Sequence, residues 1–292
     1  MLSESVDGLV TGRTGCYVDV TFGGGGHSRE ILSRLSPEGR LIAFDQDPEA
    51  AANCPEDDRF QFVPQNFRHL KKWLSFYKAV PVSGILADLG VSSHQFDTPE
   101  RGFSYRFNGL LDMRMNTARE FSAADLVNTY PEEKLAQLFF QYGELPNAKR
   151  LAAAIATTRT QKKLSTTEDL VNAVSPQLPH GKENKVLAQI FQALRIEVNG
   201  EMDVLREFLT QSAETLQSGG RLVVISYHSL EDRLVKNFMR SGNFEGEVEK
   251  DFYGNPLSPF KLVTRKAVQP DEEEVAENPR ARSAKLRIAE KI

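Results

Sequence analysis

The sequence predicts an α/β fold in which a Rossmann-like sheet carries an inserted all-helical subdomain. Three observations support this prediction. Strand-like and helix-like segments alternate up to about residue 91, which is typical of a parallel sheet. Residues 122–212 then show only helical periodicity. After them, the apolar run 221–226 indicates that the sheet resumes.

The expected strands are short runs rich in β-branched and aromatic residues. They cover 16–22, 40–45, 60–63, 83–89, 221–226, 261–264 and 283–289. Segments of helical length separate the first four strands, at 28–35, 48–53 and 67–79. We therefore expect consecutive strands to be joined by crossover helices, as in βαβ units.

The middle of the chain predicts a helical insertion. Polar residues with interspersed glycines predict a long ordered loop over 92–116. Ser122 and Asp125 then form a capping-box pattern, with Asp in place of the usual Glu. Apolar residues recur at helical spacing in 133–142, 148–158, 167–175 and 185–198. We assign 1–107 and 201–292 to the sheet domain and 108–200 to the inserted helical subdomain.

Charge and composition narrow the function classes. The formal net charge of −4 gives no global attraction to nucleic acid. Locally, 149–163 holds five basic residues and no acidic one, and 280–292 has a net charge of +4, which favours a polyanionic partner. Two cysteines, no signal-peptide pattern and no apolar run of about 20 residues predict a cytoplasmic protein without a membrane partner.

Four consecutive glycines, Gly23 to Gly26, follow the first strand, and Asp45 ends the second. In doubly wound folds, a glycine turn approaches a flat ligand closely and an acid at the second strand binds ribose hydroxyls. The dinucleotide pattern G-x-G-x-x-G is only partly met, because Ser28 or Arg29 stands at its last position. No Gly-Lys-Ser/Thr follows either. A cofactor with a ribose but no pyrophosphate, S-adenosyl-L-methionine, fits this pattern best.

Other candidate residues stand at the ends of later strands, where ligands of open α/β sheets bind. Asp88 ends the fourth strand, and His228 follows the run 221–226. Neutral imidazole could accept a proton near neutral pH, although His228 is equally suited to cap the next helix. Phe67 begins the segment after the third strand, where it could pack on a nucleobase or belong to the core.

Five stretches carry a family resemblance. They are 17–28, 88–93 with 101–104, 111–115, 226–233 and 278–287. Together they resemble the bacterial ribosomal RNA cytosine-N4 methyltransferases of the MraW family. The resemblance implies a class I methyltransferase sheet, S-adenosyl-L-methionine as cofactor, and 16S ribosomal RNA in the small ribosomal subunit as partner. The implied reaction methylates the exocyclic N4 amine of a specific cytidine.

The resemblance also implies roles for individual residues. Gly25, Gly26 and His27 would receive the methionine part of the cofactor, and Asp45 would hold the ribose hydroxyls. The adenine would lie between Phe67 and Asp88, and Gln95 would close over the cofactor.

The reaction needs further groups. A cytosine amine is a poor nucleophile, so hydrogen-bond acceptors must orient it. Candidates are a backbone carbonyl in 88–93, Ser92, Ser93 or Asp112. Arg114 and Lys162, the latter in the basic segment 149–163, are expected to contact RNA phosphates.

Two other classes stay open at this stage. The glycine turn with Asp45 also suits a nicotinamide-dependent oxidoreductase, although the broken dinucleotide pattern disfavours it. An RNA-binding ribosome-assembly factor with a vestigial cofactor pocket is the second alternative. No DNA partner is expected, and a homodimer stays open.

Overall fold

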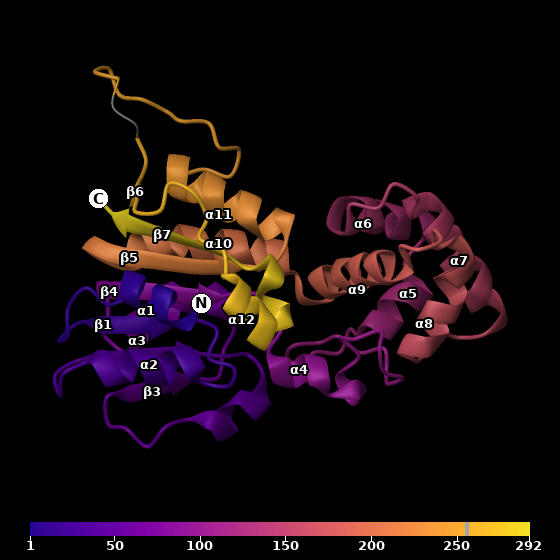
Figure 1. Cartoon of the computed structure of the whole chain (residues 1–292), viewed down its shortest axis with the longest axis horizontal. Coiled ribbons are helices and arrows are strands. Elements are labelled where there is room, and N and C mark those ends of the chain that lie inside the picture. The colour runs from indigo at the N-terminus through magenta and orange to yellow at the C-terminus, as the bar shows by residue number, and fades with distance from the viewer. Residues whose placement is uncertain (255–256) are drawn as a thin grey trace. The chain divides into compact units, whose positions relative to one another are not determined.

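The structure is a computed structural model that describes residues 1–254 and 257–292. Its contacts divide the chain into unit 1, residues 1–90 and 202–292, and unit 2, residues 91–201 (Figure 1). The segment 91–107, which we assigned to the sheet domain, thus groups with the helices. Within the described ranges, no helix has both the length and the apolar character needed to cross a membrane.

Unit 1 contains a seven-stranded sheet in the order β3-β2-β1-β4-β5-β7-β6. Its strands are β1 (Cys16–Asp19), β2 (Arg40–Phe44), β3 (Phe60–Val63), β4 (Val82–Asp88), β5 (Leu216–Ser226), β6 (Phe260–Leu262) and β7 (Lys285–Lys291). The first five strands pair in parallel, and β7 lies antiparallel between β5 and β6. This confirms the predicted Rossmann-like sheet.

β1 ends earlier than predicted. The strand stops at Asp19, although apolar residues continue to Phe22. The side chain of Asp19 accepts a hydrogen bond from the backbone N–H of Thr21 at 3.1 Å. Such a local side-chain bond offers the backbone an alternative to the strand ladder, so the chain turns here toward the glycines.

The helices of unit 1 surround this sheet. They are α1 (Leu2–Leu9), α2 (Gly26–Arg34), η1 (Pro48–Asn53), η2 (Phe67–His69), α3 (Leu70–Phe76), α10 (Glu201–Thr215, of which Glu201 groups with unit 2), α11 (Ser229–Ser241), α12 (Glu272–Glu277) and η5 (Pro279–Ser283). One face of the sheet forms a core with α1 and α2, in which Val6 and Ile31 pack with Val223 and Ile225 of β5. α1 had no counterpart in our sequence prediction.

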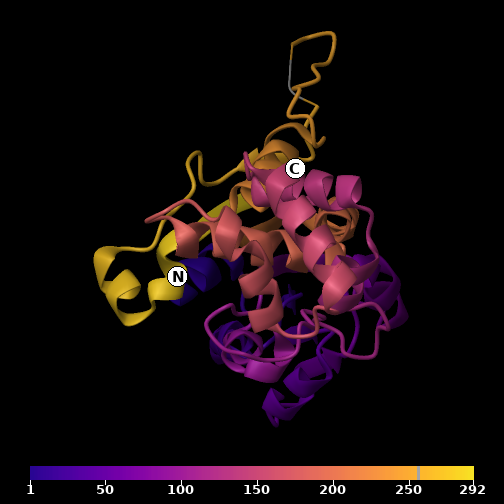
Figure 2. The same cartoon turned by 90° about the vertical axis from the view of Figure 1, so that its right-hand side faces the viewer.

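Unit 2 is helical from α5 onward (Figure 2). Its elements are α4 (Ser93–Asp97), η3 (Pro99–Arg101), α5 (Ala123–Thr129), α6 (Glu132–Gly143), α7 (Ala148–Gln161), α8 (Thr167–Val174), η4 (Ser175–Gln177) and α9 (Glu183–Asn199). A separate core is built by α5 to α9, with Leu138, Phe139, Ile155 and Ile190 among its members. The capping box of Ser122 and Asp125 is present as predicted.

Candidate active site

The candidate site of unit 1 lies where four adjacent parallel strands end. β2, β1, β4 and β5 are neighbours in this order. Their carboxyl ends therefore present Asp45, Asp19, Asp88 and Tyr227 along one edge of the sheet. The sequence predicted two of these residues, Asp45 and Asp88, as cofactor-binding.

The glycine turn joins this edge to helix α2. Gly25 is the N-cap of α2 and has φ of 76°, a left-handed conformation that favours glycine. A Cβ atom on Gly25 would lie 3.0 Å from the ring of Phe22, whereas Cβ atoms on Gly24 and Gly26 would meet nothing within 4 Å. Gly25 is thus required by the turn itself, and its two neighbours leave open space beside the backbone.

Asp45 is tied to the same turn. Its Oδ2 accepts a hydrogen bond from the N–H of Gly23 at 2.7 Å, and its Oδ1 accepts one from Asp47 at 2.8 Å. Burial raises the pKa of the carboxyl group to about 6, although these hydrogen bonds act in the opposite direction. Each oxygen keeps a lone pair for a ligand hydroxyl.

Asp19 anchors the first turn of α2. It is fully buried, and its Oδ2 accepts a hydrogen bond from the Ser28 hydroxyl at 2.7 Å. Burial raises the pKa of Asp19, while the neighbouring His27 and the Ser28 hydroxyl lower it. Asp19 thus fixes the start of α2.

His27 of α2, Asp88 of β4 and Tyr227, which follows β5, form a polar chain at the carboxyl ends of these strands. The Nδ1 atom of His27 lies 3.8 Å from Oδ2 of Asp88, and the hydroxyl of Tyr227 donates to Oδ1 of Asp88 at 2.8 Å. Burial raises the pKa of Asp88, and His27 is the strongest opposing influence. The pKa of Tyr227 is raised as well, by burial and by the Asp88 carboxylate. Tyr227 therefore keeps its proton and holds this carboxylate in place.

The sequence analysis singled out the neighbouring His228 and gave Tyr227 no role. The signal available was its position directly after β5, the neighbour of β4. That adjacency depends on strand order, which a sequence read one segment at a time does not supply.

His228 caps helix α11. Its Nδ1 accepts a hydrogen bond from the backbone N–H of Glu231 at 3.4 Å, and its Nε2 lies 3.1 Å from Glu231 Oε1. The Nε2 contact lacks hydrogen-bond geometry despite the short distance. Since the Nδ1 lone pair is occupied, the ring proton belongs on Nε2, next to the carboxylate. The capping alternative is thus realised, and the proton-accepting role of His228 stays a prediction.

Phe67 lies in η2, directly after β3 and before α3. Its ring meets that of Phe208 in α10 edge to face, with 5.3 Å between the ring centroids. The side chain is only partly buried. Phe208 thus supports the ring of Phe67 while part of its surface stays exposed to a ligand.

The four remaining predicted site residues belong to unit 2. Gln95 is nearly buried in the first turn of α4 and forms a capping box with Ser92. Its Oε1 accepts a hydrogen bond from the Ser92 N–H at 3.2 Å. This fixes the start of α4, and closure of Gln95 over a cofactor stays a prediction.

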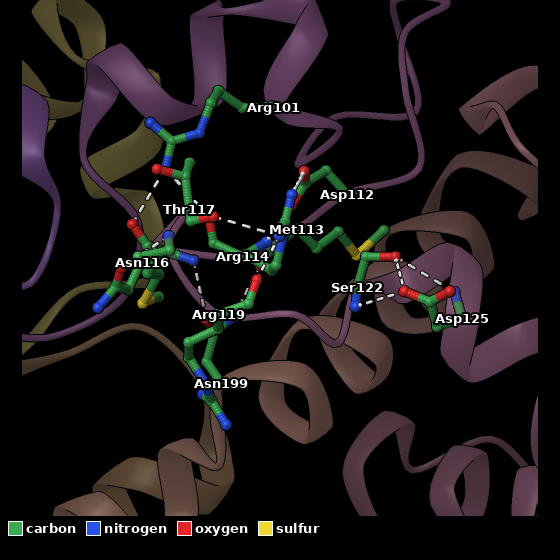
Figure 3. A network of polar contacts seen from close by, with 12 residues as sticks. Arg101, Asp112, Met113, Arg114, Asn116, Thr117, Arg119, Ser122, Asp125 and Asn199 are labelled. Atoms are coloured by element: carbon green, nitrogen blue, oxygen red, sulfur yellow. Dashed lines mark hydrogen bonds and ion pairs between the residues drawn. The ribbon is translucent and has the colours of Figure 1, made fainter.

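Asp112 and Arg114 form an ion pair with each other (Figure 3). Arg114 donates from Nε to Oδ1 of Asp112 at 2.7 Å and from a terminal nitrogen to Oδ2 at 2.6 Å. Met113 between them has φ of 59°, a left-handed conformation that is uncommon for this residue type. The side chains for which we predicted separate contacts, one with the base and one with phosphate, therefore act as a pair.

Two buried side chains hold this loop, Arg101 from above and Asn199 from below in the view of Figure 3. Arg101 donates to the carbonyl oxygens of Arg114 and Met115 at 3.0 and 3.1 Å. Asn199 accepts from the N–H of Met115 at 2.9 Å and donates to the carbonyl of Met113 at 2.8 Å. The backbone 113–115 is therefore fixed by side-chain contacts rather than by regular secondary structure.

Lys162 ends helix α7 and pairs with Asp169, with 2.6 Å between its ammonium and Oδ1. This contact lowers the pKa of Asp169 to about 2. The lysine side chain is 72% exposed, so it can also reach a solvent-side anion. Hydrogen bonds with Ser122 lower the pKa of Asp125, and the charges of Lys163 and Arg114 add to this effect.

The strand-end residues of unit 1 fit S-adenosyl-L-methionine. Gly24 and Gly26 leave open space beside the backbone, and the buried Nε2 of His27 has no hydrogen-bond partner among the described residues. The first N–H groups of α2 also lack helical acceptors, which suits the carboxylate of an amino acid. A nucleoside with a methionine side chain would satisfy these groups.

Comparisons with known proteins agree with this geometry. All of the chain, residues 1–292, matches the MraW methylase family. A protein of Parabacteroides distasonis named Ribosomal RNA small subunit methyltransferase H is 57% identical over 293 residues, covering 100% of this chain and 96% of the relative. A protein of the same name from Flavobacterium psychrophilum is 58% identical over 291 residues, covering 100% of both. The chain belongs to the MraW methylase family and is an S-adenosylmethionine-dependent methyltransferase.

Proposed function

We propose that this protein transfers a methyl group from S-adenosyl-L-methionine to the N4 amine of a cytidine in 16S ribosomal RNA of the small subunit. The observation that carries this proposal is the glycine turn beside Asp45, with its open space at Gly24 and Gly26. The names of the relatives support the substrate. Membership in a methylase family argues against the nicotinamide-dependent oxidoreductase.

In this proposal the residues of unit 1 bind the cofactor. Gly25, Gly26 and His27 receive its methionine part, and Asp45 accepts hydrogen bonds from the ribose hydroxyls. Phe67 and Asp88 bound the adenine, with Asp88 held by Tyr227. The bound cofactor supplies a methyl group on a positively charged sulfur. Gln95 from unit 2 completes the proposed set.

The amine of cytosine must be oriented before it can attack. Its lone pair is delocalised into the ring, so acceptors on its N–H groups must direct the remaining electron density toward the methyl group. Asp112 is an acceptor whose orientation Arg114 fixes, and carbonyls of 88–93, Ser92 and Ser93 are the alternatives. His228 is the candidate for taking the released proton, which requires its ring to leave Glu231.

RNA would be held by the basic groups of unit 2. Arg114, Lys162 and Lys163 are the candidates, and Lys162 is 72% exposed although it pairs with Asp169. Phosphate contacts of this kind hold RNA without reading its sequence. Flipping the target base out of its stack costs a few kcal/mol, which such contacts would offset.

The test measures transfer from labelled S-adenosylmethionine to small ribosomal subunits from cells that lack this methylation. We expect label in N4-methylcytidine after nucleoside analysis. Asp45→Asn and Asp112→Asn should lower the rate, whereas Asp203→Asn, at a carboxylate that is 81% exposed on α10, should not. Cofactor binding without any transfer would contradict the proposal and favour the RNA-binding assembly factor.

A further inference from the structure

An exposed group of aromatic rings lies at the end of helix α3. Trp73, Phe76 and Tyr77 contact one another, with ring centroids 5.6 Å apart for Trp73–Phe76 and 5.1 Å apart for Phe76–Tyr77. The Trp73 and Tyr77 rings stack at 6.4 Å. Phe76 is 70% exposed, and the other two rings are partly exposed.

These rings are not required to hold α3 on the sheet. The helix packs through Leu70 and Leu74, which are both fully buried. Because Phe76 is mostly exposed, its ring contributes little hydrophobic stabilisation to the fold. Three adjoining rings form an apolar surface of the kind that marks interaction sites.

Two lysines flank the rings. The ammonium of Lys72 lies 5.9 Å from the centroid of the Trp73 ring, and Lys78 follows Tyr77. Nearby Arg68 and Lys71 are neutralised by Glu207 and Glu214 of α10. Among the residues that the structure describes, neither Lys72 nor Lys78 forms an ion pair with a carboxylate. We call the five residues Lys72, Trp73, Phe76, Tyr77 and Lys78 the aromatic–lysine surface.

The aromatic–lysine surface lies away from the candidate active site. α3 begins after the carboxyl end of β3 and leads back to the start of β4, so its last turn reaches the opposite edge of the sheet (Figure 1). Arg40, the first residue of β2, donates a hydrogen bond to the carbonyl of Tyr77 at 3.2 Å, which confirms this position. The surface therefore belongs to neither the cofactor site nor the basic groups of unit 2.

We propose that the aromatic–lysine surface binds unpaired nucleotides of the RNA substrate at a distance from the target cytidine. A nucleobase would stack on Phe76, and the phosphates beside it would meet Lys72 and Lys78. Aromatic rings interleaved with unpaired cations are the usual platform for single-stranded RNA, because every base offers a flat face and every linkage a charge. The inference rests on the proposed function, since it presupposes an RNA substrate.

The charge of the surface favours RNA over a second copy of this chain. In a symmetric dimer the same patch meets itself, which would bring Lys72 and Lys78 against their own equivalents. No carboxylate in the patch compensates these charges. RNA phosphates are complementary to them.

The test compares Phe76→Ala and the double variant Lys72→Gln/Lys78→Gln with the unaltered protein. Glutamine removes the charge but keeps a long, unbranched side chain. This matters at Lys78, whose φ of 54° makes the position sensitive to the type of side chain. Two matched controls come from unit 1: Phe252→Ala, at a ring that is 98% exposed beside Asp251, and Lys236→Gln on α11. Binding to deproteinised 16S RNA and KM for intact small subunits are both measured, together with cofactor affinity.

We expect Phe76→Ala to weaken RNA binding and to raise KM about tenfold, because one stacked base is lost. The double lysine variant should reduce the slope of log affinity against log salt by about 1.4, at about 0.7 per phosphate contact in single strands. Cofactor affinity and kcat should stay unchanged in both variants, and both controls should behave like the unaltered protein.

Three outcomes would overturn the inference. RNA affinity and KM could stay unchanged in both variants. Alternatively, the two control variants could lose as much RNA affinity as the Phe76 and lysine variants. The variants could instead shift the protein from dimer to monomer in light scattering, which would assign the surface to a second copy. Because RNA binding is measured without turnover, an inactive unaltered protein would contradict the proposed function and not this surface.

Discussion

Asp45 combines burial with a position beside the proposed ribose site, so its protonation couples pH to cofactor binding. Its pKa is raised from 3.8 to about 6, chiefly by burial. Ionising this carboxyl group therefore opposes folding, and the cost appears as pH rises from about 4 through about 6. Only the ionised group accepts hydrogen bonds with both oxygens.

The resulting prediction concerns cofactor affinity between pH 5 and 8. We expect affinity to rise by about tenfold through a midpoint near pH 6 and to level off above pH 7, because a hydrogen bond to a charged acceptor is stronger than one to a neutral one. Asp45→Asn should remove this dependence. Calorimetry across the range provides the measurement, and a pH profile that persists in the Asn variant would assign the titration to another group.

Two substitutions of His228 separate its role as a helix cap from its proposed role as a proton acceptor. Asn is a good N-cap and Ala is not, so capping predicts that only His228→Ala loses stability, by about 1 kcal/mol. A general base predicts that both variants lose at least about 100-fold in kcat. We expect the Asn variant to keep its stability, because an amide can cap α11, and both variants to lose kcat, because His228 is the proposed proton acceptor. Single-turnover rates with thermal melts decide between the two roles.

At the scale of elements, the turn between β1 and α2 depends on one glycine. Gly25→Ala should destabilise unit 1 by about 1–2 kcal/mol, since the residue has φ of 76° and its Cβ would press on Phe22. Gly24→Ala is the matched control, because its Cβ meets nothing within 4 Å. Melting of the cofactor-free protein measures both. Equal losses in the two variants would mean that the turn tolerates no side chain at either position.

The loop that carries Asp112 and Arg114 depends on Asn199 of α9. Asn199→Ala leaves the N–H of Met115 and the carbonyl of Met113 without these partners, which should cost about 2–4 kcal/mol. Hydrogen exchange of 112–119 should accelerate most. Asn128→Ala, which removes contacts of a half-buried amide in unit 2, is the control and should leave exchange of 112–119 unchanged.

Strands were the elements that the sequence predicted best. The runs 40–45 and 60–63 became β2 and β3 almost residue for residue, because buried parallel strands are short apolar segments with clear ends. α1 escaped prediction because its eight residues carry only two buried apolar side chains, Val6 and Leu9, too few for a periodic signal.

The candidate site was predictable only in part. The glycine turn and Asp45 follow from local patterns, and the structure joins them by a direct hydrogen bond. Asp112 pairs with Arg114 across Met113, which has a left-handed backbone conformation. Methionine has no preference for that conformation, so the sequence could not predict the pair. The link between Tyr227 and Asp88 spans β5 and β4, so it arises from strand order rather than from nearby sequence.

At the scale of the whole molecule, the two units have separate hydrophobic cores. Phe139 is fully buried in unit 2, so Phe139→Ala should destabilise that unit by about 3–5 kcal/mol. Hydrogen exchange should accelerate in 123–199 and stay unchanged in β1, β2 and β4. Ile31→Ala, in the core of unit 1, should give the reverse pattern. Loss of protection throughout the chain in both variants would mean that the units unfold together.

The division into units also determines the order in which the two units can fold while the chain is being synthesised. Residues 91–201 are continuous, whereas the sheet needs strands from both sides of them. At about 5–20 residues per second, β5 leaves the ribosome on the order of ten seconds after β4. β7, which lies between β5 and β6, follows later still. During that interval β4 exposes an unpaired edge while the helical unit can already fold. Chaperones that shield strand edges should therefore engage the nascent chain in this window.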